Sequence, residues 1–198
     1  SEIADNVYNA ISAGQKTGDA VNFVSNATKL AKAGFTDSAS SLDILSTVMN
    51  AYGLEAEKVN NVSDMLIQTH NKGKTTVAEL STNMGRVIPT AQSMGVGLDN
   101  LCSAYSIMTA KGISTAESTT YINSMLNELG KSSTTVGKVL KEQTGMSFQE
   151  CMDSGMSLGD VLGQLKDYAD KSGTSFNELW SSSEAGKAGL SLLSDGVD

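Results

Sequence analysis

The chain has 198 residues, a formal net charge of −8, and 14 Lys and Arg residues that are scattered along it. Surfaces that bind nucleic acids need clustered basic side chains to displace counterions, so this composition argues against direct nucleic-acid binding. No apolar run approaches the roughly 20 residues that span a bilayer, and the acidic N-terminus has no signal-peptide pattern, so no membrane contact is expected in this segment.

A recurring Gly-x-Ser/Thr signature divides the chain into predicted helices. Glycine can adopt the left-handed conformation that ends a helix, and a Ser or Thr two residues later can cap the next helix. Three copies of the signature are 39 residues apart, and three more fall off that spacing: 34–36, 73–75, 112–114, 145–147, 155–157 and 173–175. The pattern predicts helices joined by very short turns.

Between these turns, apolar residues recur at the intervals typical of one buried helical face. Ile3, Val7 and Ile11 share one face of the first predicted helix, which Gly14 ends. The next three helices are predicted to start at Asp19, Thr36 and about Glu55, and to end at Gly34, Gly53 and Gly73. Their predicted buried positions are Val21, Val24, Ala27, Leu30, Leu42, Leu45, Met49, Tyr52, Val59, Val62, Leu66 and Thr69.

Thr75 is predicted to open a fifth helix, with Glu79 near its positive end, and Pro89 is predicted to break or kink it. Ser114 and Glu117 form a predicted capping box at the start of the seventh helix, after a sixth one. The predicted buried positions of these helices are Val77, Leu80, Met84, Val87, Leu98, Leu101, Tyr105, Met108, Ile122, Met125 and Leu129.

The pattern changes after Gly130. A polar link leads to short predicted helices at Val136–Gln143 and Phe148–Met152, a longer one from Leu158, and a short piece around Trp180. Residues 181–188 are small and polar, no helix is assigned to them, and the C-terminal end is expected to be frayed. We therefore expect an all-α fold of about eight to ten helices, in which a compact array of helical hairpins folds back into a bundle. Residues 1–130 would form its core domain, and residues 131–198 a smaller helical extension packed on that core.

Few residues are arranged for chemistry. His70 is the only histidine, and its position near a helix C-terminus favours an interaction with the helix dipole. Cys102 and Cys151 lack metal or redox spacing and are expected to be buried free thiols. We therefore predict no catalytic, cofactor-binding or metal-binding residue.

Carboxylates provide the enzymatic alternative. Glu117-Ser118 lies at a helix start, and a Glu-Ser dipeptide carries the acid of soluble lytic transglycosylases. The Gly-Leu-Met-Gln stretch and aromatic groove of that family are absent here, and capping accounts for Glu117. Asp153, Asp160 and Asp167 are spaced by seven residues but interrupted by a glycine, so we interpret them as a solvated face.

Six short motifs run in order along the chain: residues 10–14, 31–37, 50–54, 87–91, 109–113 and 126–129. In combination they resemble the central domain of phage tail tape measure proteins, as found in long-tailed phages and prophages of Gram-positive bacteria. The likeness extends from about Glu2 to Gly145. None of the motifs is diagnostic by itself.

The resemblance implies a structural protein of the virion tail that sets tail length during assembly and leaves with the DNA during infection. It implies partners among tail tube, tail tip and tail assembly chaperone proteins, together with self-association. We expect the chain to be a segment of a longer protein and, because it is predicted to be compact, a module attached to the ruler. The alternatives are a peptidoglycan-degrading, lytic transglycosylase-like module that uses Glu117, and a membrane-active segment that aids DNA entry.

Overall fold

The computed structural model describes residues 2–12, 17–34 and 36–193. These ranges contain twelve α-helices and three short 3₁₀-helices, and no strand. The predicted all-α class and the hairpin array are confirmed. Gly14, the predicted end of the first helix, and residues 194–198 of the predicted frayed end lie outside the described residues.

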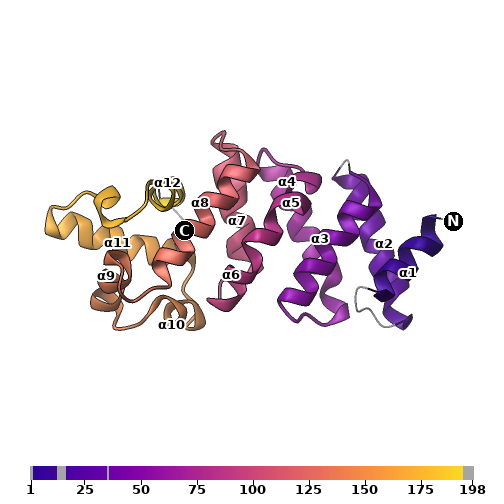
Figure 1. Ribbon diagram of the computed structural model, residues 1–198, viewed down its shortest axis with the longest axis horizontal. Helices are drawn as coiled ribbons and strands as arrows, with labels where there is room; N and C mark the ends of the chain where they lie inside the picture. The colour runs from indigo at the N-terminus through magenta and orange to yellow at the C-terminus, as the bar shows by residue number, and fades with distance from the viewer. Residues whose placement is uncertain (1, 13–16, 35, 194–198) are drawn as a thin grey trace.

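Helices α1 to α8 form two rows that run along the long axis of the molecule (Figure 1). One row contains α1, α3, α5, α6 and α8, and the other contains α2, α4 and α7. The two rows pack on each other through the pairs α1–α2, α2–α3, α3–α4, α4–α5 and α7–α8. Their bounds are α1 Glu2–Ser12, α2 Thr17–Ala33, α3 Ser38–Ala51, α4 Val59–Lys72, α5 Val77–Asn83, α6 Ile88–Ser93, α7 Leu98–Ala110 and α8 Thr115–Leu129.

The remaining helices form the C-terminal part, which contacts the stack mainly through α9 and α12. Helix α9 packs on α8, α10 and α11, whereas α12 packs on α8 and α7 and takes the next place in the second row (Figure 1). Their bounds are α9 Thr135–Thr144, α10 Phe148–Asp153, α11 Leu158–Ser172 and α12 Ser183–Leu193. The predicted fold-back into a bundle is therefore wrong for α1 to α8, because each hairpin there contacts only its neighbours along the stack.

The 3₁₀-helices lie at breaks between α-helices. They are η1 Ala56–Lys58, η2 Met84–Arg86 and η3 Phe176–Leu179. The predicted fifth helix is divided into α5, η2 and α6, with Pro89 in the first turn of α6. A proline fits this position because the first N–H groups of a helix have no intrahelical acceptor.

Two predicted helix caps are wrong by one residue. Asp37 rather than Thr36 caps α3, and Thr76 rather than Thr75 caps α5, in a complete capping box with Glu79. Thr75 is buried instead, and its hydroxyl forms a hydrogen bond of 2.7 Å with that of Thr115 in α8. Asp19, the residue predicted to cap the second helix, lies in the first turn of α2 rather than before it. Thr75, the predicted cap residue, therefore joins successive hairpins, and its neighbour Thr76 caps the helix.

The regularly spaced glycines serve two different purposes. Gly112 has a φ of 92° and ends α7 as the signature predicts. Gly34 and Gly73 do not adopt a positive φ. A Cβ at Gly34 would lie 2.4 Å from Cγ2 of Val77, and one at Gly73 would lie 2.4 Å from Oγ1 of Thr109. These two glycines are required because the next hairpin packs directly against the backbone.

The predicted core positions are buried from Leu42 to Leu129, except that Tyr52 is half-buried and donates its hydroxyl to the carbonyl of Val96 at 3.0 Å. The predicted N-terminal face is wrong. Ile3, Ile11 and Val21 are exposed. Among the described helices, α1 packs mainly on α2 and α3, and its outer side is exposed.

Helix α12 begins at Ser183, within residues 181–188, to which the sequence pattern assigns no helix. Its inward side is made of small residues that allow a close approach to α8 and to the Trp180 ring, and tertiary packing of this kind supplies most helix stability in proteins. The buried residues of α12 are Ala185, Gly186, Ala188, Gly189 and Leu192.

Candidate interaction surfaces

Glu117 is exposed at the start of α8 and is engaged with its own helix cap. Its backbone N–H donates to Oγ of Ser114 at 3.1 Å, and the Ser114 hydroxyl donates to its carboxylate at 3.4 Å. The shallow hollow beside it, of about 350 Å³, is bordered by Arg86, Tyr121 and Glu184. This arrangement is that of a helix cap, since a general acid is usually desolvated to hold its proton.

The two cysteines are free and buried, Cys102 on α7 and Cys151 on α10. Burial raises the pKa of the Cys102 thiol to about 11, although a hydrogen bond with Thr69 acts in the opposite direction. A thiol with a raised pKa is a poor nucleophile at neutral pH. His70 is half-buried in the last turn of α4. Across the described ranges, no group of three or more His, Cys, Asp or Glu residues is placed to hold a metal ion.

The three regularly spaced aspartates do not form a common site. Asp153 is the last residue of α10, and Asp160 forms a complete capping box with Ser157 at the start of α11. Asp167 lies on α11, where it forms an ion pair with Lys171 at 2.8 Å. All three aspartates are exposed, as the interpretation of a solvated face predicts. They lie on two different helices and do not share a contact.

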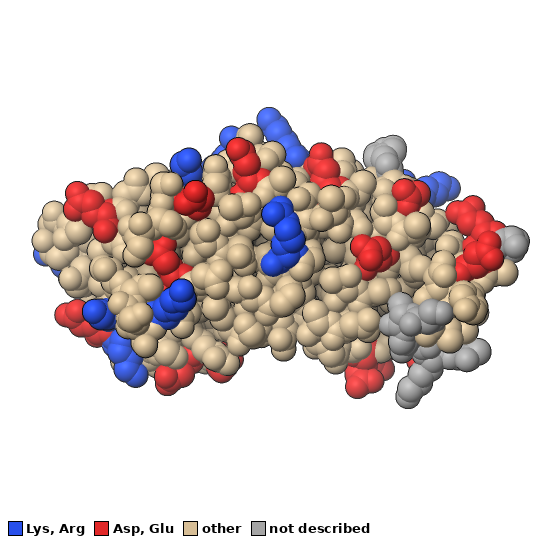
Figure 2. Space-filling view, in the orientation of Figure 1, with Lys and Arg blue, Asp and Glu red and all other residues tan. Residues whose placement is uncertain are grey.

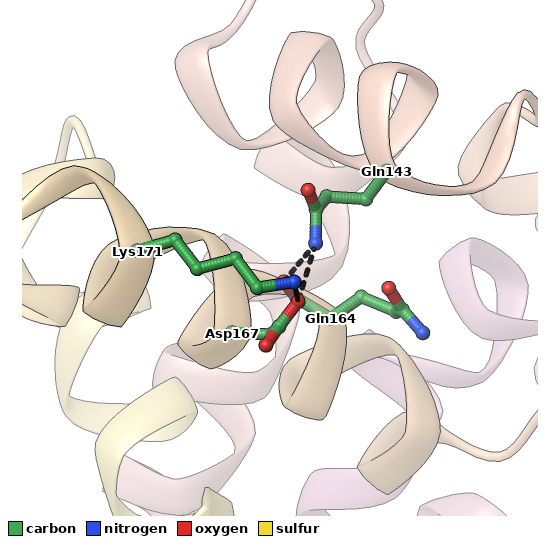
Figure 3. A network of polar contacts seen from close by, with 4 residues as sticks. All are labelled: Gln143, Gln164, Asp167 and Lys171. Carbon is green, nitrogen blue, oxygen red and sulfur yellow. Dashed lines mark hydrogen bonds and ion pairs between the residues drawn. The ribbon is translucent and has the colours of Figure 1, made fainter.

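Asp167 also belongs to a polar network that joins α9 to α11 (Figure 3). Nε2 of Gln143 donates to Asp167 at 3.1 Å and to the backbone carbonyl of Gln164 at 3.3 Å. The hydrogen bonds from Lys171 and Gln143 lower the pKa of the Asp167 carboxyl group. The network therefore ties α9 to α11 through side-chain hydrogen bonds.

Glu128 is a buried carboxylate that the sequence analysis missed. Its Oε1 accepts a hydrogen bond of 2.6 Å from the backbone N–H of Ser181. Its Oε2 accepts bonds of 3.2 and 3.0 Å from the N–H and hydroxyl of Ser182. The carboxylate therefore holds the N-terminus of α12 against α8. No local pattern could reveal this contact, because its partners lie more than 50 residues away.

The N-terminal apolar face consists of Ile3, Tyr8, Ile11 and Val21 on α1 and α2. Their exposed fractions are 72%, 72%, 40% and 66%, and among the described residues the only other large apolar side chain so exposed is Leu190. The exposed acidic residues Glu2 and Asp5 lie on the same helix α1. Because α1 and α2 pack on each other, these exposed apolar side chains make the pair a candidate interaction surface.

A second surface, the basic pocket, is a cavity of about 370 Å³ between the end of α8, α9 and the start of α10. Leu129 and Phe148 line it and are buried, whereas Lys138 and Lys141 on α9 are exposed at its edge. Figure 2 shows basic side chains over this part of the molecule with acidic ones among them, and the charge of Lys141 lowers the pKa of the Glu150 carboxyl group, after the hydrogen bonds from Ser147. Gly130, Ser132, Gly137 and Ser147 complete the lining.

A third surface is a groove of about 430 Å³ between α4 and α7. Met65 and Ile107 supply apolar area to it, and Ser103, Ser106 and Ala110 leave the α7 side shallow. None of the three surfaces was identified from the sequence, because each depends on how far apart the helices lie. Among the described helices, none has the length and apolar character needed to cross a bilayer.

A stack of helical hairpins in which polar side chains serve as caps and ties, and which presents apolar surfaces, defines a structural and interaction module. The chain belongs to the phage-related minor tail protein family, whose model matches residues 1–182. The resemblance to tape measure proteins is thereby confirmed.

Two relatives of the chain are named tape measure proteins. The chain is 38% identical over 97% of its length to the "Probable tape measure protein" of Clostridium phage phiCD119, and it covers 21% of that protein. It is 26% identical over 83% of its length to the "Tape measure protein" of Pneumococcus phage Dp-1, and it covers 14% of that one. The chain therefore spans about a fifth or less of these relatives. No solved structure matches it.

Proposed function

We propose that this chain is a structural segment of a phage or prophage tail tape measure protein and acts in tail assembly, tail length determination and DNA ejection. The observation that carries the proposal is the 38% identity over 97% of the chain to a probable tape measure protein. In this proposal the chain resides in the virion tail, and residues 1–130 form a core stack that residues 131–198 extend.

The segment acts through packing and contact rather than catalysis. Its partners are tail tube, tail tip or tail assembly chaperone proteins and other copies of itself, and the three candidate surfaces support this reading. The net charge of −8 speaks against direct DNA binding. Glu117, the residue on which an enzymatic role depends, is exposed and engaged in a cap.

The geometry of the stack favours a module attached to a ruler. A continuous helix gains about 58 Å over a 39-residue interval, since each residue adds 1.5 Å. In a stack, the same interval advances the structure by only one helix spacing, roughly 10 Å. Residues arranged in this way contribute little length, so other segments of the protein would measure the tail.

Mass spectrometry of purified virions tests the proposal. We expect peptides from this segment in tails, within one protein much longer than 198 residues. Their absence from virions, together with a short free protein in the cell, would contradict the structural role.

Incubation of the chain with peptidoglycan tests the enzymatic alternative. We expect no release of muropeptides, and the same result from Glu117→Gln. Release that the substitution abolishes would establish catalysis instead. Sedimentation with anionic liposomes tests the membrane-active alternative, and we expect the chain to stay in the supernatant because anionic bilayers favour basic amphipathic helices.

A further inference from the structure

The C-terminal unit, residues 176–193, consists of η3, α12 and the connection between them. Its internal contacts centre on Trp180, whose ring meets Phe176 edge-on and lies against Gly189 of α12. Because these contacts do not involve the rest of the chain, η3 and α12 can keep them while the unit moves as a whole.

The seat of α12 is formed by α7 and α8 and has a charge at each end. At one end, the buried carboxylate of Glu128 accepts hydrogen bonds from the backbone N–H groups of Ser181 and Ser182 at 2.6 and 3.2 Å. At the other end, the ammonium group of Lys111 donates to the backbone carbonyl of Ser191. The seat therefore places a negative charge at the start of α12 and a positive charge at its end, as the helix dipole favours.

Between these two charges, α12 fits the seat through small side chains. Apart from Leu192, the buried residues of α12 are alanines and glycines. Beside them, the ammonium group of Lys187 lies over the Tyr121 ring of α8, 5.3 Å from its centroid. Because glycines inside a helix lower its intrinsic stability, α12 depends on the seat for its structure. Any helix with the same residues would fit the seat equally well.

A short connection, residues 173–175, joins the C-terminal unit to α11. Gly173 and Ser175 are exposed, and Gly173 ends α11 with a φ of 72°. Glycine adopts left-handed and extended backbone about equally readily, and hinges are short loop segments that absorb such changes. Straightening this connection would therefore carry the unit away from its own seat without unfolding a helix.

We infer that two copies of this chain exchange their C-terminal units, so that α12 of each copy occupies the seat on α7 and α8 of the other. The seated helix itself identifies the occupant, because a second copy carries the same residues and repeats every contact described above. Exchange of an identical element is a low-cost route to a dimer, since mainly the connection differs between the closed monomer and the exchanged dimer. The inference specifies the self-association included in the proposed function and takes only its biological setting from it.

Cross-linking between two differently substituted 198-residue chains tests the exchange. One chain carries Tyr121→Cys on α8 and the other Lys187→Cys on α12. The two are mixed at high concentration, warmed to just below the unfolding midpoint, cooled and treated with a short bismaleimide. We expect a covalent heterodimer, because these two positions meet in the seat. Lys29→Cys, exposed on α2, replaces Tyr121→Cys in the matched control and should give no heterodimer above the level of the parent chain, whose Cys102 and Cys151 are buried.

Gly173→Val tests the connection. Valine is unfavourable at a positive φ, so the substitution strains the closed monomer but not a straightened connection. We expect the dimer association constant, measured by sedimentation over a range of concentrations, to rise about tenfold or more, because both copies lose this strain on exchange. Gly145→Val is the matched control: Gly145 ends α9 with a φ of 74°, and both glycines have open space around them. The exchange leaves the turn at Gly145 unchanged, so this variant should associate like the parent chain.

A heterodimer no more abundant than in the Lys29→Cys control would overturn the inference. A Gly173→Val chain that associates no more strongly than Gly145→Val would also overturn it, since any dimer would then form without opening of the connection. Circular dichroism checks that each variant keeps its helices. Neither result bears on whether the segment is found in virion tails, so failure here is distinguishable from failure of the tape measure proposal.

Discussion

At one end of the stack, α12 covers α8 and leaves mainly small residues between them, whereas at the other end α1 and α2 expose Ile3, Tyr8 and Val21 to solvent. The ends of a helical stack need a cap, because an end hairpin has only one neighbour to cover its apolar side. The chain supplies a cap for the α8 end and none for the α1 end among the described residues. Among the described residues, the two ends therefore differ in how much large apolar surface they expose.

The closed end depends on one large side chain and one carboxylate. The Trp180 ring lies against α12 so closely that a Cβ at Gly189 would be 2.7 Å from its Cζ2, and its edge meets Phe176 in a T-shaped contact with centroids 6.0 Å apart. Glu128 then fixes the first turn of α12. Both elements are absent at the open end, and this difference leads to four predictions.

The largest effect is expected from Trp180→Ala, which removes the ring that lies between Phe176 and α12 and should lower the free energy of unfolding by about 3–5 kcal/mol. Tyr8→Ala, an aromatic truncation at the open end, should change it by no more than about 0.5 kcal/mol, because Tyr8 is exposed. Urea unfolding at low protein concentration measures both. Equal losses would show that the two ends do not differ as described.

Glu128→Ala should cost about 1–3 kcal/mol, because the N–H groups of Ser181 and Ser182 would lose their acceptor in a poorly hydrated position. Amide hydrogen exchange should accelerate at the start of α12 and remain unchanged in α3. Glu117→Ala, at an exposed cap, serves as the control and should leave exchange in α12 unaffected. Slow exchange in the Glu128 variant would contradict the capping role.

Gly73→Ala should destabilise the middle of the stack by about 1–3 kcal/mol, since its Cβ would meet Oγ1 of Thr109 and the backbone of Ser106. Gly163→Ala is its matched control in the C-terminal part. Gly163 lies within α11 with open space around it, so alanine there should stabilise the protein by about 0.5–1 kcal/mol. Thermal unfolding should show a lower midpoint temperature for Gly73→Ala and a higher one for Gly163→Ala than for the parent chain. A Gly73→Ala variant with an unchanged midpoint would refute close packing of the hairpins.

The smallest effect concerns acid. The pKa values of Asp37, Glu150 and Asp167 are lowered below 3.8 for Asp and 4.5 for Glu by hydrogen bonds from Ser40, Ser147 and Lys171, respectively. Their contribution to stability is therefore present above those values and is lost as the pH falls through the lowered pKa. Glu150→Gln with Asp167→Asn should make the acid-induced decline shallower, as followed by unfolding between neutral and acidic pH. An unchanged pH profile would show that these contacts contribute nothing.

Local periodicity predicted the middle of the stack well, because α3, α4, α7 and α8 each have helices on more than one side. The same periodicity failed at Ile3 and Ile11, since it shows which residues share a face but not whether another helix covers that face. The glycine signature was ambiguous for a related reason. Glycine permits both a left-handed turn, as at Gly112, and a close approach, as at Gly73, and only the neighbouring hairpin distinguishes these uses.

The candidate surfaces were largely beyond sequence reasoning. The basic pocket depends on residues of α8, α9 and α10 that meet only after folding. Likewise, α12 was missed because its serines and glycines have weak helix propensity and gain their structure from contacts with α8 and Trp180.

The neighbour-to-neighbour packing of the two rows also determines how the chain would respond to a pulling force. When tension is applied along the long axis, each hairpin is restrained only by the next one, so α1 to α8 would yield one hairpin at a time at low force. The α8 end differs, because α12 joins segments more than 50 residues apart in sequence and must detach before the residues between them can extend. Helix α12 would therefore restrain residues 129–180 against extension until its contacts with α8 break.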